Sequence, residues 1–154
     1  MAEILGAVSA ALGIVAFALQ VGSTVETLRD LRKLTSGDAL KDLEAISEMF
    51  DSLQETLTFL HQTPIHKVDD DGQRLLKAKL RQCSEKCARV DEELSQLRQR
   101  SLKATLGRKQ KWNRFKLATG RFKEQVQDIR HNVTEMNSGL VLWVILLFMS
   151  YRES

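Results

Sequence analysis

Two cysteines and three histidines are the residues in this chain whose side chains most often perform chemistry. Cys83 and Cys87 stand four positions apart, so a helix would place both thiols on one face. Two thiolates supply only half of a tetrahedral zinc site, and no other cysteine or histidine follows at a suitable spacing. Both cysteines also fall on an apolar stripe, where a free cysteine packs as a small hydrophobic side chain. We therefore expect a structural role for both cysteines and no metal site.

The histidines do not belong to any recognisable catalytic motif. His61, His66 and His131 are scattered, two of them near the single proline, Pro64. The sequence contains no glycine-rich phosphate loop, no G-x-S-x-G turn and no H-E-x-x-H helix. No residue can be assigned as catalytic, so we expect neither an enzyme nor a bound cofactor.

The charge is distributed unevenly along the chain. Residues 98–123 hold ten Lys or Arg and no acid, whereas residues 1–62 hold four Lys or Arg against nine Asp or Glu. A solvated helix face is the simplest explanation of the basic block, which could also bind anionic lipid, nucleic acid or an acidic protein. Among these ligands, membrane-length apolar sequence in the same small chain favours anionic lipid over nucleic acid. The cations that we assign to lipid head groups are Arg108, Lys109, Lys111 and Arg114.

The N-terminal segment carries no charge from Ile4 to Val25. As a helix, these 22 residues would be about 33 Å long, which is enough to cross a hydrocarbon core. In the resting protein we expect a central helix that its neighbours bury. Such a helix could exchange its protein surroundings for a membrane. The side chains expected to insert are Ile4, Leu5, Val8, Leu12, Ile14, Val15, Phe17, Leu19 and Val21.

Apolar residues that alternate between spacings of three and four predict three further helices. The stripes are Leu43, Ile46, Phe50, Leu53, Leu57 and Leu60; Leu76, Leu80, Cys83, Cys87, Val90, Leu94 and Leu97; and Phe115, Thr119, Phe122, Val126, Ile129, Val133, Met136 and Leu140. These stripes predict an all-α, up-down four-helix bundle with long antiparallel helices. We expect breaks at Ser36-Gly37, where Ser36 or Asp38 would cap the next helix, at Thr63-Pro64, and near Gly107.

The C-terminal segment is apolar again. Leu140 to Met149 follows Ser138-Gly139 and is too short to be a confident membrane span. We expect a bundle domain over residues 1–137. Residues 138–154 would form an additional short helix, packed on the bundle or lying at a membrane interface.

The start of the chain and its cysteines both favour a cytoplasmic protein. Met1-Ala2-Glu3 lacks the basic start of a secretory signal. The two cysteines do not form a disulfide framework of the secreted kind.

The opening of the chain resembles a group of fungal signalling domains. Met1 to Val8, Leu12 to Val21 and Leu28 to Leu31 are similar to the HeLo-like and SesA-type domains that begin STAND/NLR-like proteins. The resemblance is strongest over residues 1–34 and then rests on the helical layout to about residue 137. It implies a bundle related to the executioner bundles of necroptosis and to plant resistosome coiled-coil domains.

This resemblance implies a membrane-targeting, pore-forming cell-death effector. Self-association, driven by a nucleotide-binding oligomerisation module in the same chain or a partner, would free Ile4 to Val21 for insertion in the plasma membrane. The sequence ends at Ser154 without such a module, which departs from the usual architecture. Two alternatives stay open: a soluble helical module that signals by self-association, and an integral protein held by both apolar ends.

Overall fold

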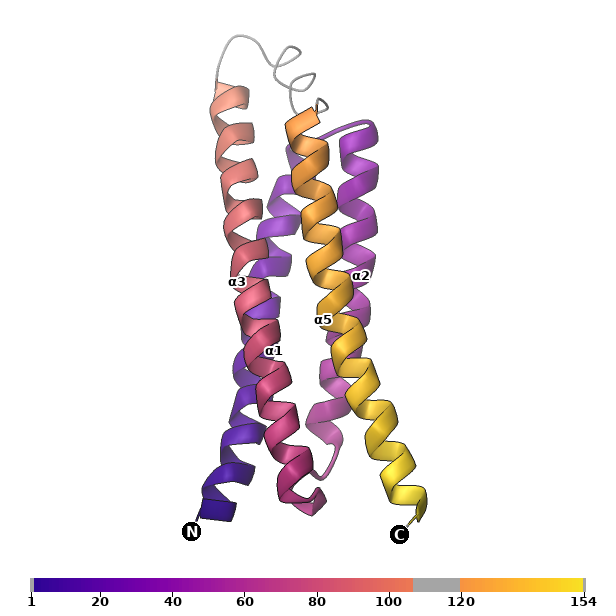
Figure 1. The fold of residues 1–154 in the computed structure, drawn as a ribbon. Coiled ribbons are helices and arrows are strands. Elements are labelled where there is room, and N and C mark those ends of the chain that lie inside the picture. Colours follow the sequence, from indigo (N-terminus) through magenta and orange to yellow (C-terminus); the bar gives the residue numbers. More distant parts are fainter. Residues whose placement is uncertain (1, 107–119, 154) are drawn as a thin grey trace.

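The computed structural model describes residues 2–106 and 120–153, and this part of the chain consists of helices joined by short loops, without a strand (Figure 1). Helix α1 spans Ala2–Lys33 and α2 spans Asp38–Gln62. A short 3-10 helix, η1, covers Ile65–Lys67. Helix α3 then spans Asp70–Leu106, and α5 spans Gly120–Glu153.

The long helices run up and down beside one another. Helix α1 packs against α2 and α3, and α5 packs against the same two helices, so α1 and α5 lie diagonally across the bundle. The first turn of α1 and the last turn of α5 lie at one end, and the α1–α2 connection lies toward the other (Figure 1). The predicted all-α, up-down four-helix bundle is confirmed.

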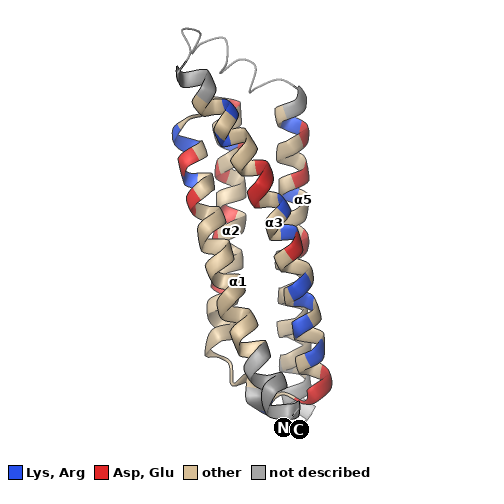
Figure 2. Ribbon diagram, turned by 90° about the vertical axis from the view of Figure 1, so that its left-hand side faces the viewer, with Lys and Arg blue, Asp and Glu red and all other residues tan. Residues whose placement is uncertain are grey.

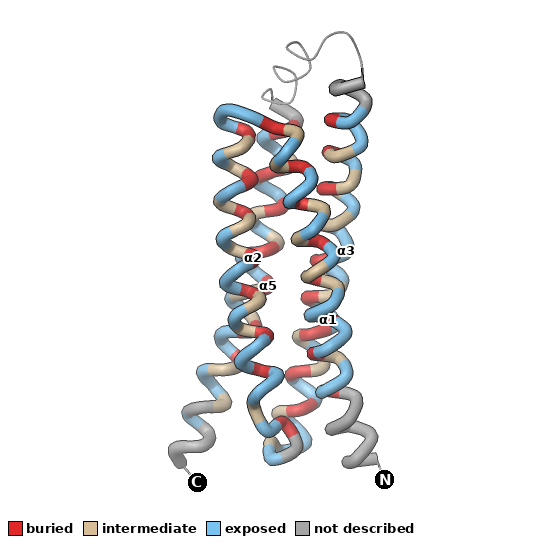
Figure 3. The backbone as a smooth tube through the Cα atoms, turned by 180° about the vertical axis from the view of Figure 1, so that it is seen from behind, coloured by how far each residue is buried: buried red, intermediate tan, exposed pale blue. Residues whose placement is uncertain are grey.

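The predicted stripes form the core. All the apolar residues predicted for the second and third helices are buried, and so are those of the fourth from Phe122 to Leu140. Figure 3 shows that buried positions recur along the inward side of each helix. Phe115 and Thr119 lie outside the described residues. The stripes are buried because a spacing of three and four keeps apolar side chains on one side of a helix, where neighbouring helices cover them.

The expected helix breaks at Gly37 and Pro64 are present, but the capping differs from the prediction. Gly37 has a φ of 69°, a left-handed conformation that favours glycine, and it precedes α2 without a side-chain capping bond. Neither Ser36 nor Asp38 therefore caps α2 in the expected way. Helix α2 ends at Gln62, and the next residue, Thr63, is extended, as the residue before a proline prefers to be. The expected turn at Gly107 lies outside the described residues.

The C-terminal apolar segment does not form a separate helix. Helix α5 continues without a break through Ser138 and Gly139, so the expected additional short helix is wrong. A glycine inside a helix costs about 1 kcal/mol, which the continuing stripe offsets because Leu140 and Trp143 are both buried. The Trp143 indole nitrogen also donates to the carbonyl of Gly72 at 3.1 Å, which ties α5 to the start of α3.

Candidate membrane-facing surface

Helix α1 lies at the periphery of the bundle, so the expectation of a central, buried helix is wrong. Its segment Ala10–Lys33 contains a window that is long and apolar enough to cross a membrane, with a mean hydropathy of 1.5 over that window. Buried helices of soluble proteins and N-terminal signals can share these properties. Only 33% of that segment's most apolar window is buried, however. A helix in a four-helix bundle buries one stripe, and α1 is apolar on its outer side as well.

The inner and outer sides of α1 divide the residues expected to insert into a membrane. Ile14, Phe17 and Val21 lie in the core. Leu12, Val15 and Leu19 are 61%, 40% and 72% exposed. We call Leu12, Val15 and Leu19 the outer stripe of α1. The side chains of Ile4, Leu5 and Val8 lie outside the described ones.

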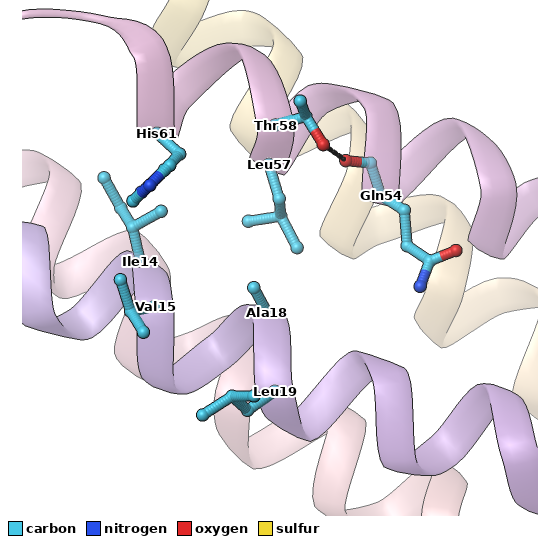
Figure 4. Close-up of a pocket in the computed structure, with 8 residues that line it drawn as sticks. All are labelled: Ile14, Val15, Ala18, Leu19, Gln54, Leu57, Thr58 and His61. Atoms are coloured by element: carbon cyan, nitrogen blue, oxygen red, sulfur yellow. Dashed lines mark hydrogen bonds between the residues drawn. The ribbon is translucent and has the colours of Figure 1, made fainter.

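A groove between α1 and α2 borders the outer stripe (Figure 4). It has a volume of about 340 Å³. Its lining residues are Ile14, Val15, Ala18 and Leu19 from α1, and Gln54, Leu57, Thr58 and His61 from α2. The Thr58 hydroxyl donates to the Gln54 carbonyl at 2.9 Å, so this polar group is already satisfied within α2. The groove extends the apolar surface of α1 toward α2.

Exposed apolar side chains gather toward the end of the bundle where the first turn of α1 and the last turn of α5 lie. We call this set the apolar end. Its members are Leu12, Val15, Leu19, Phe59, Leu75, Val141, Leu142, Ile145, Leu146 and Met149. All four long helices contribute, and among the large hydrophobic residues recorded as exposed only Leu102 lies toward the other end. Exposed apolar side chains that gather toward one end of a small protein make that end a candidate contact surface for a partner or a membrane.

Charged residues are concentrated away from this end, except on α3. Figure 2 shows α1 without charge over its lower part, whereas its upper part carries both signs. The helix is uncharged from Ala10 to Val25, and α5 is uncharged from Met136 to Met149. On α3, by contrast, Lys77 and Arg81 lie near the apolar end. The start of α3 therefore brings charges of both signs to the apolar end, with the acids Asp70 and Asp71 in its first turn and the cations Lys77 and Arg81 beyond them. Hydrophobic surface beside these two cations is the combination that favours an anionic membrane surface.

The cysteines lie in the core between helices. The Thr24 hydroxyl and the Cys87 sulfur are 3.6 Å apart, and the Cys83 thiol contacts the Met136 carbonyl at 3.8 Å. Burial raises the pKa of the Cys83 thiol to about 11, and burial likewise raises the pKa of Cys87. Both thiols are therefore in the structural position expected from the stripe. Among the described residues no cluster of three or more metal-binding side chains occurs.

The remaining candidate residues are not brought together. His61 lines the α1–α2 groove, whereas His131 pairs with Glu135 on α5, with Nε2 and Oε1 3.0 Å apart. The proposed head-group cations Arg108, Lys109, Lys111 and Arg114 lie outside the described residues.

Comparison with protein-family models shows which family the chain belongs to. Residues 2–142 match the family described as the N-terminal domain of the pigment biosynthesis cluster protein PigL, abbreviated PigL_N. The chain belongs to this family. The PigL_N match covers α1, α2, α3 and α5 as far as Leu142. It makes the chain a fungal helical domain but does not single out the HeLo-like or SesA-type group. Neither the curated proteins nor the solved structures gave a significant match.

Sequence reasoning missed part of this surface. The exposed residues of α5, among them Leu142, Ile145 and Met149, were assigned to a separate helix. Their spacing of three and four is a second stripe beside the core stripe of the same helix, and that signal was present in the sequence. Lys77 and Arg81 were also missed, because residues 63–97 balance at seven bases and seven acids.

Proposed function

We propose that this PigL_N domain is a membrane-targeting, pore-forming cell-death effector, activated by oligomerisation and release of α1. It would move from the cytoplasm to the plasma membrane and bind anionic lipids there. The observation that carries the proposal is the outer stripe of α1, which leaves apolar side chains exposed on the uncharged segment from Ala10 to Val25. The cell-death part comes from the HeLo-like resemblance, since the family description names a pigment biosynthesis cluster and no activity.

Release of α1 would exchange one apolar environment for another. In the bundle Ile14, Phe17 and Val21 are buried against the neighbouring helices, and fully burying such a side chain contributes about 1.5–3 kcal/mol. Insertion in a bilayer would keep these side chains out of water and would bury Leu12 and Leu19 as well. Burial of the outer stripe would therefore make the inserted state of α1 more stable than the packed state. Loss of the core contacts on the inner side would be the barrier to the release of α1.

Leakage of a dye from vesicles tests the proposal, with phosphatidylserine-containing vesicles compared with pure phosphatidylcholine. We expect the Leu12→Glu/Leu19→Glu variant to release the dye more than about 100-fold more slowly than the wild type does, because each charge in a membrane core costs about 3 kcal/mol. Both side chains are exposed, so the variant keeps its core. Phe17 is unsuitable for the same test because it is buried.

The matched control is Gln99→Glu/Leu102→Glu, which adds the same charge to the exposed surface of α3 and leaves α1 unchanged. Circular dichroism should show native helicity for both variants. Equal leakage by the α1 variant and the wild type would contradict the proposal. A wild type that leaves both kinds of vesicle intact would contradict it too.

The outer stripe also favours a second candidate function, a soluble module that signals by self-association. Leu12, Val15 and Leu19 are spaced three and four apart, a pattern that packs well against a helix of another copy. In that case sedimentation would detect concentration-dependent oligomers without lipid, and vesicles would neither bind the protein nor leak.

A further inference from the structure

We infer that Lys77 and Arg81 bind the phosphate head group of an anionic phospholipid in the groove between α1 and α3. This site rests on the proposed membrane function and gives it a specific lipid contact on the described part of the bundle. It differs from the head-group residues expected from the sequence, which lie between α3 and α5 along the chain.

The groove is built by small residues on α1 and cations on α3. It has a volume of about 270 Å³ and is lined by Gly13, Ala16, Phe17 and Gln20 from α1 and by Lys77, Leu80, Arg81 and Ser84 from α3. A Cβ atom on Gly13 would lie 3.4 Å from Leu80 Cδ1, an ordinary van der Waals contact, so α1 and α3 lie close together at this position. Phe17 and Leu80 are buried, which gives the groove an apolar floor.

The charged side chains that line the groove are both cations. Lys77 and Arg81 stand one helical turn apart and are the only ionisable residues that line the groove. Within the described residues neither cation forms an ion pair, whereas Lys86 pairs with Glu135 and Arg98 pairs with Asp30. Two adjacent cations without an acidic partner fit a phosphate, to which an arginine can donate two hydrogen bonds.

The neutral polar groups of the groove are already engaged with each other. The Gln20 side-chain nitrogen donates to the Ser84 carbonyl at 2.9 Å, and the Ser84 hydroxyl donates to Gln20 Oε1 at 2.8 Å. These bonds join α1 to α3 at one side of the groove. The ligand is therefore recognised mainly through the net negative charge of its head group.

The surroundings of the groove decide between a lipid and a free anion. Ala16 lies on its edge and is exposed, and the outer stripe of α1 continues from there without a charge. A phospholipid whose phosphate contacts Lys77 and Arg81 can lay its acyl chains along this stripe, which adds hydrophobic contact that a free phosphate lacks.

Vesicle flotation tests the site in the full chain, with phosphatidylcholine vesicles prepared with and without phosphatidylserine. We expect the Lys77→Gln/Arg81→Gln variant to bind the anionic vesicles about 10- to 30-fold more weakly than the wild type. The matched control is Lys41→Gln/Arg89→Gln, which likewise removes one lysine and one arginine. Both positions are exposed and lie outside the basic block, and neither side chain forms an ion pair within the described residues. The control should lose less than about threefold.

The outcomes separate this site from the proposed function. Equal losses in the two variants would show diffuse attraction and overturn the site. Millimolar inorganic phosphate that displaces the wild type would indicate a free-anion site and overturn the lipid assignment. If the wild type releases dye from vesicles while Lys77→Gln/Arg81→Gln binds anionic vesicles as well as the wild type does, only the site is overturned. If the wild type binds neither kind of vesicle, the site and the proposed function both fail.

Discussion

Cys83 and Cys87 show how burial in this bundle changes the chemistry of a side chain. Desolvation is the largest influence on the Cys83 thiol, and it outweighs the opposing attraction of Lys86 and Lys79, so its pKa rises from 9.0 to about 11. Nucleophilic cysteines need the opposite shift, because the thiolate is the reactive form. The same residues that could have begun a metal site are thus held as neutral core side chains.

Alkylation of the native protein at pH 8 with iodoacetamide should be slow at both cysteines. We expect rates more than about 100-fold below those in urea, because the thiols are buried and mostly protonated. Mass spectrometry of timed samples measures this. Rapid modification of the folded protein would contradict the burial of these thiols.

The raised pKa of the Cys83 thiol also makes the free energy of unfolding depend on pH. The folded state keeps Cys83 protonated while the unfolded state ionises near the ordinary value of 9.0. Its contribution to stability is therefore complete below pH 9 and is lost as the pH rises toward 11. Urea unfolding over this range should show a steeper loss for the wild type than for Cys83→Ala.

At the scale of an element, α1 combines a buried side and an exposed apolar side in one uninterrupted helix. Its attachment to α3 includes the contact between Thr24 and Cys87 and the bonds between Gln20 and Ser84. Because α1 runs unbroken through Thr24, residues 4–21 cannot leave as part of a rigid helix while Thr24 stays fixed.

A disulfide at this contact should prevent pore formation. Thr24→Cys places a thiol beside Cys87, where the native atoms are 3.6 Å apart. We expect the oxidised variant to lose vesicle leakage and to recover it when a reductant is added. Non-reducing peptide mapping confirms the bond. Leakage at the same rate in the oxidised and reduced forms would contradict release of α1.

At the scale of the whole molecule, exposed apolar side chains are separated from the charges of α1 along the bundle axis, whereas α3 carries charge along its whole length. The apolar end draws residues from all four helices, including Leu75 of α3 and Met149 of α5. The other end carries most of the exposed charge of α1 (Figure 2). This separation predicts that the bundle approaches a membrane with its apolar end.

An environment-sensitive fluorophore reports that orientation. When the fluorophore is attached to the Leu75→Cys variant, its emission should shift to the blue and become brighter on anionic vesicles, because that site enters an apolar environment. The matched label at Gln99→Cys, on the same helix but farther from the apolar end, should change little. The buried native cysteines leave the new thiol as the preferred site of labelling. Equal shifts at both sites would contradict the predicted orientation.

Much of the fold could be predicted because the core stripes are periodic. Leu43 to Leu60 and Leu76 to Leu97 keep one face apolar over many turns, and such a face must be covered in water. The candidate surface could be predicted only in part. Composition identified α1 as membrane-like, but it could not show that Leu12 and Leu19 are exposed while Phe17 is buried.

The sequence by itself determined the inward faces of α2 and α3, and that of α5 from Phe122 to Leu140, because spacing along one helix is a local property of the chain. The tertiary structure alone decided which neighbour covers each remaining face. It left the outer side of α1 exposed, joined Trp143 of α5 to the core of the bundle, and brought Lys77 and Arg81 beside Gly13. These outcomes depend on contacts between residues far apart in the chain, about which the local pattern carries no information.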